Sequence, residues 1–174
     1  MSRVLLAASS SCLLVLSLAA CSGNGGGADG GGGNVIPCDG GSITLDVTAP
    51  DCLWAPDHKM VLFTLDDIHA TVTGTCGTPS VSIVGVTDNQ PALGGGQGDT
   101  APDYTYNPTG VCLRAERQGT SSAPRVYTIL VAATDGNITV EKSVDVTVGH
   151  DQSRDHCALV DSSRIVDDGD SRCN

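Results

Sequence analysis

Charged and imidazole side chains recur in this sequence where β-branched, apolar segments begin or end. Arginine binds carboxylates and phosphates through two parallel N–H donors, and neighbouring histidine and lysine add further donors. In a sandwich of antiparallel strands, these loops would meet at one end and form a binding site for a small anion, a sugar or a peptide terminus. The candidate residues are His58, Lys59, Asp88, Arg117, Arg125, His150 and Asp151. The alternative is that these side chains form ordinary polar caps and ion pairs at loop ends.

Acidic loop residues suggest a second kind of chemistry, calcium binding. Calcium takes about six to eight oxygen ligands, which carboxylates and amides supply. The candidate metal ligands are Asp67, Asp99, Asp103, Asp135 and Asn137. Their spacing does not match an EF-hand loop, and Asp and Asn are also common turn residues, so ordinary turns are the alternative. Calcium is the only cofactor that the sequence suggests.

Catalysis has no comparable pattern. The sequence contains no G-x-S-x-G, no H-E-x-x-H and no glycine-rich phosphate loop. We therefore expect a protein that is not an enzyme. A small hydrolase built on His58 and His150 is the less favoured alternative.

The cysteines indicate an exported chain. Of the eight, Cys12 and Cys21 belong to the apolar N-terminal stretch and its end. The other six are an even set, typical of a disulfide framework: Cys38, Cys52, Cys76, Cys112, Cys157 and Cys173. Proximity favours the pairs Cys38–Cys52, Cys76–Cys112 and Cys157–Cys173, although other pairings are open. A zinc site is the alternative, but no C-x-x-C pair is present. Trp54, the single tryptophan, is expected to pack against a disulfide.

The N-terminus has the layout of a secretory signal, with Arg3 before an apolar stretch at residues 4–20. A retained membrane anchor is the alternative. The string Leu18-Ala19-Ala20-Cys21 resembles the lipobox of bacterial lipoproteins. This resemblance implies removal of residues 1–20 and acylation of Cys21, which holds a protein stably on a bilayer. Because Ser22 follows the cysteine, the resemblance also implies the outer membrane, with the protein periplasmic or surface-exposed.

The amino-acid composition indicates the nature of residues 21–37 and the kind of partner that the chain can bind. Residues 21–37 are glycine-rich, so we expect a flexible tether after the acylated cysteine. The chain carries a net charge of −11, which disfavours binding to nucleic acid. One Trp, three Tyr and one Phe are its only aromatic residues, so disulfides would supply a substantial part of the stability.

Period-two patterns follow the tether. The windows predicted as strands are residues 42–48, 58–67, 68–73, 80–87, 111–117, 125–134 and 140–148. No window shows a helical stripe, so the sequence predicts an all-β fold, an antiparallel sandwich over residues 38–152. A long loop is expected at residues 88–110, and the acidic tail at 153–174 is expected to close on itself through its two cysteines.

Several strings occur in an order that resembles a known module. They are CLWAPDHKMV at 52–61, SIVGVTDNQP at 82–91, GDTAPDY at 98–104, LRAER at 113–117, RVYTILVAATDGN at 125–137 and VTVGHDQ at 146–152. The set resembles an immunoglobulin-like module of exported proteins of myxobacteria and related bacteria, similar to hyalin-repeat and cadherin-like sandwiches. The resemblance implies an immunoglobulin-like fold, a role in extracellular contact or spacing, and no catalytic residue. This chain has Ala55 where the module has Pro, and Gln90 where it has Glu.

Together these features predict a lipid-anchored, non-enzymatic binding or adhesion module of the cell envelope. Its partners would be the lipid bilayer, through Cys21, and a protein or glycan ligand. A calcium-stabilised structural spacer is the alternative.

Overall fold

The structure is a computed structural model of the chain. It describes residues 34–38, 41–49, 52–74, 77–90, 100–119, 121–135, 138–149, 157 and 161–174, with the main chain alone at 34–38 and 41. The predicted lipidation site Cys21 and most of the predicted tether lie outside these residues. Within the described part of the chain, no helix has the length and apolar character needed to cross a membrane.

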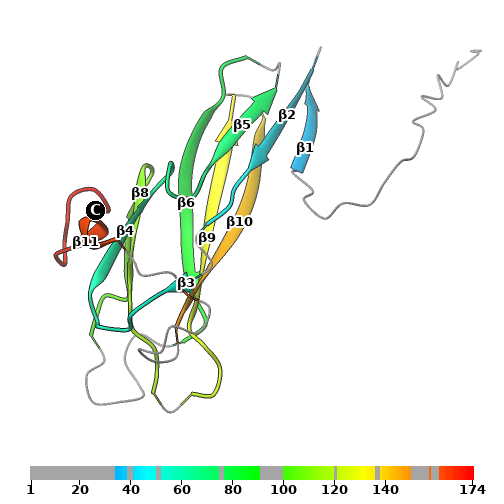
Figure 1. The fold of residues 1–174 in the computed structure, drawn as a ribbon. Coiled ribbons are helices and arrows are strands. Elements are labelled where there is room, and N and C mark those ends of the chain that lie inside the picture. Colours follow the sequence, from blue (N-terminus) through cyan, green and yellow to red (C-terminus); the bar gives the residue numbers. More distant parts are fainter. Residues whose placement is uncertain are drawn as a thin grey trace, which may run out of the picture. The chain divides into compact units, whose positions relative to one another are not determined.

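Three β-sheets make up the described chain (Figure 1). The first has the order β1-β2-β5, with β1 at Asn34–Cys38, β2 at Gly41–Asp46 and β5 at Thr71–Gly74. The second has the order β3-β10-β9-β6, with β3 at Cys52–Leu53, β10 at Thr139–Val148, β9 at Val126–Thr134 and β6 at Ser80–Asp88. The third has the order β11-β4-β8-β7, with β11 at Ile165–Val166, β4 at Met60–Thr64, β8 at Gly110–Arg114 and β7 at Tyr104–Asn107. All neighbours are antiparallel except β3 and β10, which are parallel. A short 3-10 helix, η1, spans Ser162–Arg164.

One hydrophobic core joins the three sheets, so the prediction of an all-β sandwich with disulfides is confirmed. Strand β9 shows how the sequence pattern produces it. Tyr127, Ile129 and Val131 are fully buried, and the residues between them are half-buried. Because successive side chains of a strand point to opposite faces, this alternation directs one face of β9 into the core. Ile43 of the first sheet and Phe63 of the third join the same cluster.

The C-terminal segment, residues 161–174, packs on the third sheet and buries the second face of β4. Strand β11 extends this sheet by pairing with β4, and Figure 1 shows the segment, in red, beside β4 and β8. A second apolar cluster forms between the segment and the sheet, from Met60, Leu62, Cys112, Val166 and Cys173. Arg164 lies over the ring of Phe63 at 4.2 Å and donates a hydrogen bond from Nε to the main-chain oxygen of Leu62 at 3.0 Å. β4 is therefore buried on both faces.

The two described disulfides correct the predicted pairing. Cys52 is bonded to Cys157 and Cys112 to Cys173, with Cα–Cα separations of 5.6 Å in both bridges. The entropy of loop closure grows only slowly with loop length, so proximity in sequence is a weak guide to pairing. The tail is consequently not closed on itself, because both of its cysteines bond to the sandwich. Trp54 is buried, and Gly149 lies near both its ring and the sulfur of Cys157. The burial of Trp54 agrees with the prediction, and its packing against the disulfide stays a prediction.

Three details of the predicted organisation change. The expected loop at 88–110 contains strand β7 and the beginning of β8. The predicted strand at 58–67 is shorter, because the residues after Thr64 form a turn in which Asp67 accepts hydrogen bonds from the main-chain nitrogen and Oγ1 of Thr64, both at 2.8 Å. Strand β1 begins at Asn34, so the sheet begins before the predicted boundary at Cys38.

Candidate functional site: a polar cap at one end of the sandwich

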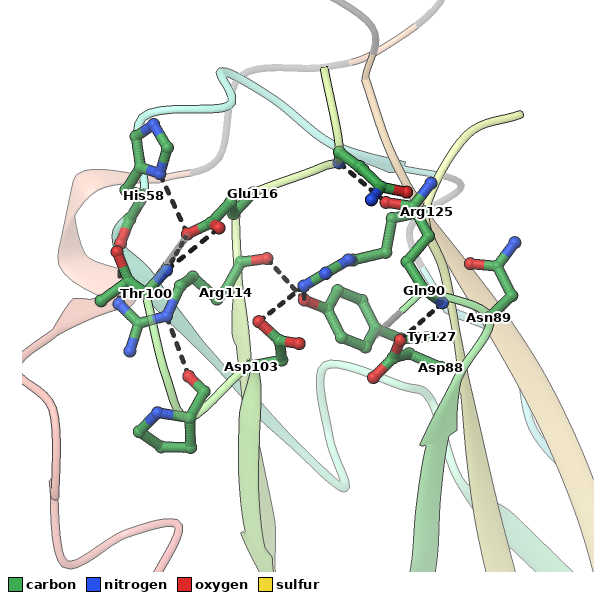
Figure 2. A network of polar contacts seen from close by, with 12 residues as sticks. His58, Asp88, Asn89, Gln90, Thr100, Asp103, Arg114, Glu116, Arg125 and Tyr127 are labelled. Atoms are coloured by element: carbon green, nitrogen blue, oxygen red, sulfur yellow. Dashed lines mark hydrogen bonds and ion pairs between the residues drawn. The ribbon is translucent and has the colours of Figure 1, made fainter. Parts of the chain in front are cut away.

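Strand direction gathers polar residues at one end of the sandwich. Strands β4 and β9 begin where β8 and β6 end, because their terminal pairs are Met60 with Arg114 and Tyr127 with Asp88. Strand β7 begins at the same end, beside β8. We call the resulting network the polar cap; it comprises His58, Asp88, Asn89, Gln90, Thr100, Asp103, Arg114, Glu116, Arg125 and Tyr127 (Figure 2).

A buried ion pair lies at the centre of the polar cap. Nη1 of Arg125 is 2.7 Å from Oδ1 of Asp103 and donates to the hydroxyl of Tyr127 at 3.1 Å. The Tyr127 hydroxyl in turn donates to the main-chain oxygen of Arg114 at 2.9 Å. The ring of Tyr104 meets that of Tyr127 edge-on, with centroids 6.4 Å apart. Strand β9, strand β8 and the segment before β7 are thereby joined through buried polar groups.

Burial governs the acid–base behaviour of this centre. Removal from water raises the pKa of the Asp103 carboxyl, and the hydrogen bond and positive charge of Arg125 act against that rise. Burial also raises the pKa of Tyr127, again opposed by Arg125. For Arg125 itself burial disfavours the charge, but the bonds with Tyr127 and Asp103 outweigh it and raise its pKa. The guanidinium is therefore a fixed positive charge that the surrounding oxygens hold in place.

Arg114 connects the polar cap to two loops and to the C-terminal segment. Its Nε donates to the main-chain oxygen of Pro102 at 2.9 Å, and its Nη1 donates to that of His58 at 2.9 Å. Its Nη2 lies 3.1 Å from the carboxylate of Asp168. A single buried side chain therefore sets the positions of three segments that are distant in sequence.

Glu116 and His58 form the outer part of the polar cap. Nδ1 of His58 and Oε2 of Glu116 are 3.0 Å apart, and both Glu116 oxygens accept from the main-chain nitrogen of Thr100, at 3.1 and 3.2 Å. The main chain of His58 adopts a positive φ of 65°, and its N–H donates to Ala115 at 3.0 Å. Glu116 is buried, whereas the His58 side chain is 54% exposed. The imidazole is thus oriented by a buried carboxylate and faces solvent.

The end of β6 is tied to the segment before β9. Gln90 donates from Nε2 to Ala123 at 3.0 Å and accepts from the main-chain nitrogen of Gln118 at 2.8 Å. Asn89 exchanges hydrogen bonds with the main chain at both Pro124 and Val126, at 3.0 and 2.9 Å. Residue 118 and residues 123–126 are therefore held against the end of β6 by amide side chains.

The predicted binding residues divide into three groups. His58, Asp88 and Arg125 lie in the polar cap, and Lys59 and Arg117 adjoin it in sequence. Arg125 does not have the predicted role of an exposed anion donor, because it is buried against Asp103 and Tyr127. Lys59 pairs with Asp57 at 3.2 Å. His150 and Asp151 lie outside the described residues.

Arg117 and Asp88 have local structural partners. Nη2 of Arg117 donates to the main-chain oxygen of Ser121 at 2.6 Å, so its guanidinium bridges its own loop. Asp88 accepts from the main-chain nitrogen of Gln90 at 2.8 Å. Both side chains shape the loops around the polar cap.

The predicted calcium ligands are not brought together within the described chain. Asp67 belongs to the turn after β4 and lies 3.4 Å from Arg164, and Asp135 accepts from the main-chain nitrogen of Ile138 at 2.7 Å. Asp103 is part of the polar cap instead. Asp99 and Asn137 fall outside the described residues. Across the residues that the structure describes, no three His, Cys, Asp or Glu side chains form a group able to hold a metal ion.

The polar cap is a hydrogen-bonded network with a buried centre and an exposed imidazole at its edge. The His58–Glu116 pair orients an imidazole, but among the described residues no hydrogen bond joins His58 to a serine, threonine or cysteine side chain. A catalytic triad needs a nucleophile, a base and a group that orients the base, and in the described part of the chain no nucleophile is bonded to His58. The sequence did not predict three members of this site: Asp103, Arg114 and Glu116. For Arg114 and Glu116 a signal was available, because they are charged residues of the string LRAER at the end of a buried strand.

Comparison with known proteins gives no family assignment. No family model, no curated protein and no solved structure matches the chain. Function is therefore inferred from the geometry of the polar cap and from the sequence features of the N-terminus.

Proposed function

We propose that this chain is a lipid-anchored, non-enzymatic binding module of the bacterial cell envelope, whose polar cap contacts a protein or glycan partner. The observation that carries the proposal is the burial of four charged side chains in this one network. Asp103, Arg114, Glu116 and Arg125 are each only 2–3% exposed.

A network of buried charges contributes little net stability to a fold. Replacing a buried ion pair with well-packed apolar side chains is often neutral or stabilising, because the ions lose their hydration. The network does, however, fix the relative positions of four chain segments: the loop before β4, the segment before β7, the end of β8 and the start of β9. Loops that are ordered before a partner arrives lose less conformational entropy on binding. A pre-organised loop end therefore supports a role in recognition.

The exposed part of the polar cap supplies the contact groups. The side chains of His58 and Lys59 are 54% and 56% exposed, and both carry hydrogen-bond donors. A partner that presents carbonyl, carboxylate or hydroxyl oxygens complements them. Proteins and glycans both present such oxygens, and the net charge of −11 disfavours nucleic acid.

The N-terminal sequence supports membrane attachment. Leu18-Ala19-Ala20-Cys21 resembles a lipobox, and the glycine-rich segment that follows is typical of a flexible tether. We propose that acylated Cys21 anchors the domain to the outer membrane, where the tether gives it freedom to reach its partner. Because several acyl chains hold a protein stably on a bilayer, Cys21→Ser should move the protein from the membrane fraction to the soluble fraction.

Binding is tested separately from anchoring. All proteins in this test carry Cys21→Ser, so that acyl chains cannot hold them on the membrane. The Cys21→Ser protein and its His58→Ala/Lys59→Ala variant are incubated with the bacterial envelope fraction, and the bound protein is quantified. Lys142→Ala is the matched control, because it removes a partly exposed lysine on β10 that pairs with Asp46. We expect the cap variant to lose binding and the control to keep it. Equal binding by all three proteins would contradict the role of the polar cap.

The two alternatives, a calcium-stabilised spacer and a small hydrolase, gain no support from any observation on the described residues. A calcium-stabilised spacer does not require the exposed pair of His58 and Lys59 to contact a partner, so the binding experiment separates that alternative from the proposed function. A hydrolase built on His58 would also turn over its ligand, which an assay for hydrolysis of the bound envelope material would detect.

A further inference from the structure

A cleft of about 520 Å³ opens at the end of the third sheet away from the polar cap. Strand β4 starts beside the polar cap and ends at Thr64, so the turn that follows it lies at the far end. The cleft lies between this turn, the turn that joins β7 to β8, and the C-terminal segment. Its volume is within the range of small-molecule sites, roughly 300–1,000 Å³. The lining residues that matter for the argument are Leu65, Asp66, Asn107, Thr109, Ser171 and Arg172.

The walls of the cleft are fixed by internal hydrogen bonds. Oδ1 of Asn107 accepts from the nitrogen and the hydroxyl of Thr109, both at 2.9 Å, and from the nitrogen of Gly110 at 3.1 Å. Its Nδ2 donates to the main-chain oxygen of Ser171 at 3.4 Å. The disulfide between Cys112 and Cys173 attaches the same segment to β8. The cleft is therefore formed before any ligand arrives.

The side chains that line the cleft include polar groups that are free to bind a ligand. Among the described residues, the carboxylate of Asp66 and the hydroxyl of Ser171 have no hydrogen-bond or ion-pair partner, and both side chains are exposed. Arg172 is neutralised, because its Nε and Nη2 donate to the two oxygens of Asp170, both at 2.9 Å. The cleft thus offers the unpaired carboxylate of Asp66, the free hydroxyl of Ser171 and the partly buried apolar side chain of Leu65. The Thr109 hydroxyl already donates to Asn107, so its oxygen can only accept from a ligand.

We infer that the cleft binds a neutral saccharide unit. A sugar donates hydrogen bonds from its hydroxyls to a carboxylate and to the oxygen of a threonine hydroxyl, and it both donates to and accepts from a free serine hydroxyl. Its C–H face covers an apolar side chain. Asp66 and the overall charge of −11 disfavour a phosphate or a carboxylate in the same place. This inference goes beyond the proposed function, because the cleft lies away from the polar cap and shares no residue with it.

The test uses the full-length lipidated protein in detergent, with glucose as the probe and amide NMR as the readout. Binding should shift the amides at 64–66, 107, 109 and 171–172. Asp66→Ala should weaken glucose binding by about tenfold or more, since hydrogen bonds to charged groups contribute about 1.5–3 kcal/mol. Asp57→Ala removes an exposed carboxylate near the polar cap and should leave the affinity unchanged.

Two charged relatives of the probe define the ligand class. Glucuronate carries a negative charge on the same ring and should bind more weakly than glucose. Glucosamine carries a positive charge, and a preference of more than tenfold for glucosamine would show a cation site and overturn the inference. The absence of shifts in the cleft with glucose, or equal losses in Asp66→Ala and Asp57→Ala, would also overturn it. The His58→Ala/Lys59→Ala variant should bind glucose normally, so a failure at the polar cap and a failure at the cleft are distinguishable.

Discussion

Arg125 and Asp103 come from segments on either side of strand β8, and their charged groups lie 2.7 Å apart in the interior of the polar cap. Each side chain is no more than 3% exposed. A charge in such a position depends on its partner, because water cannot replace the partner when it is lost. The stability of this end of the sandwich should therefore respond sharply to either residue.

Asp103→Ala should lower the free energy of unfolding by about 3–5 kcal/mol, because it leaves the Arg125 guanidinium buried without its carboxylate. Urea unfolding at 25 °C measures the change. Asp57→Ala is the control, because it breaks an exposed pair with Lys59 and should cost about 1 kcal/mol or less. Similar losses of unfolding free energy in the two variants would show that the buried pair contributes no more to stability than the exposed pair.

Gly110→Ala should loosen the C-terminal segment. A Cβ atom at this position would collide with the main-chain oxygen of Arg172 and crowd the side chain of Leu62. We expect a loss of about 1–3 kcal/mol and faster hydrogen exchange of the amides at 161–174. Gly85→Ala is the control in β6, because its Cβ would meet Leu130 only at ordinary contact distance, 3.6 Å. A Gly110→Ala protein with unchanged exchange in these amides would contradict the tight packing of the segment on β8.

Asp170 should titrate at unusually low pH. The hydrogen bonds that Arg172 donates from its side chain and main chain lower the pKa of Asp170 from 3.8 to about 2. The unfolded chain therefore binds more protons between these values, so this interaction stabilises the fold above about pH 4 and is lost as the pH falls through about 2. A carboxyl NMR titration measures the pKa, and Arg172→Ala should raise it toward 3.8. An unchanged pKa in the variant would rule out the Arg172 side chain as the cause, because the main-chain N–H of residue 172 remains.

Calcium should leave the melting temperature of the oxidised protein unchanged. A ligand that binds only the folded state raises stability by mass action, so a calcium site would appear as a shift at millimolar calcium. We expect none, because Asp67, Asp103 and Asp135 are engaged by hydrogen bonds or ion pairs within the protein. A rise of several degrees that a chelator reverses would contradict this prediction and revive the structural-spacer alternative.

Disulfide mapping of the non-reduced protein should yield three linked pairs. Cys52–Cys157 and Cys112–Cys173 are given by the structure. Cys38 and Cys76 are then the remaining cysteines after the predicted signal and lipidation site, and an even set in an exported chain favours their pairing. Peptide mass spectrometry after proteolysis at acidic pH, which suppresses exchange, identifies each pair. Free thiols at both positions would contradict the third bridge.

The long strands were predictable because their pattern is local. Residues 125–134 and 140–148 alternate between apolar and polar or small side chains, and they form β9 and β10 almost as predicted. The short strands were not. Strand β3 has two residues and exists because it pairs with the end of β10, and β7 lies within a stretch rich in glycine and proline. Such strands depend on contacts between distant segments, which no window of sequence contains.

The candidate site was predictable only in its location. Alternating strand direction was enough to bring His58, Asp88 and Arg125 to one end. The partner of each charge was not predictable, because Asp103 and Arg114 are distant from the residues they contact. For the same reason the sequence predicts an exposed donor at Arg125, whereas the structure buries it with Asp103.

The order of the bonded cysteines has a consequence for biogenesis. Cys112 precedes Cys157 in the chain, so the loops closed by Cys52–Cys157 and Cys112–Cys173 overlap. Under the proposed export, the chain would enter an oxidising compartment from its N-terminus and expose Cys52, Cys76 and Cys112 before either C-terminal partner arrives. Bonds made in order of arrival would therefore be wrong, and they must be exchanged through attack by a thiolate before the native pairs form. The yield of native protein should consequently depend on a disulfide isomerase as well as on an oxidant.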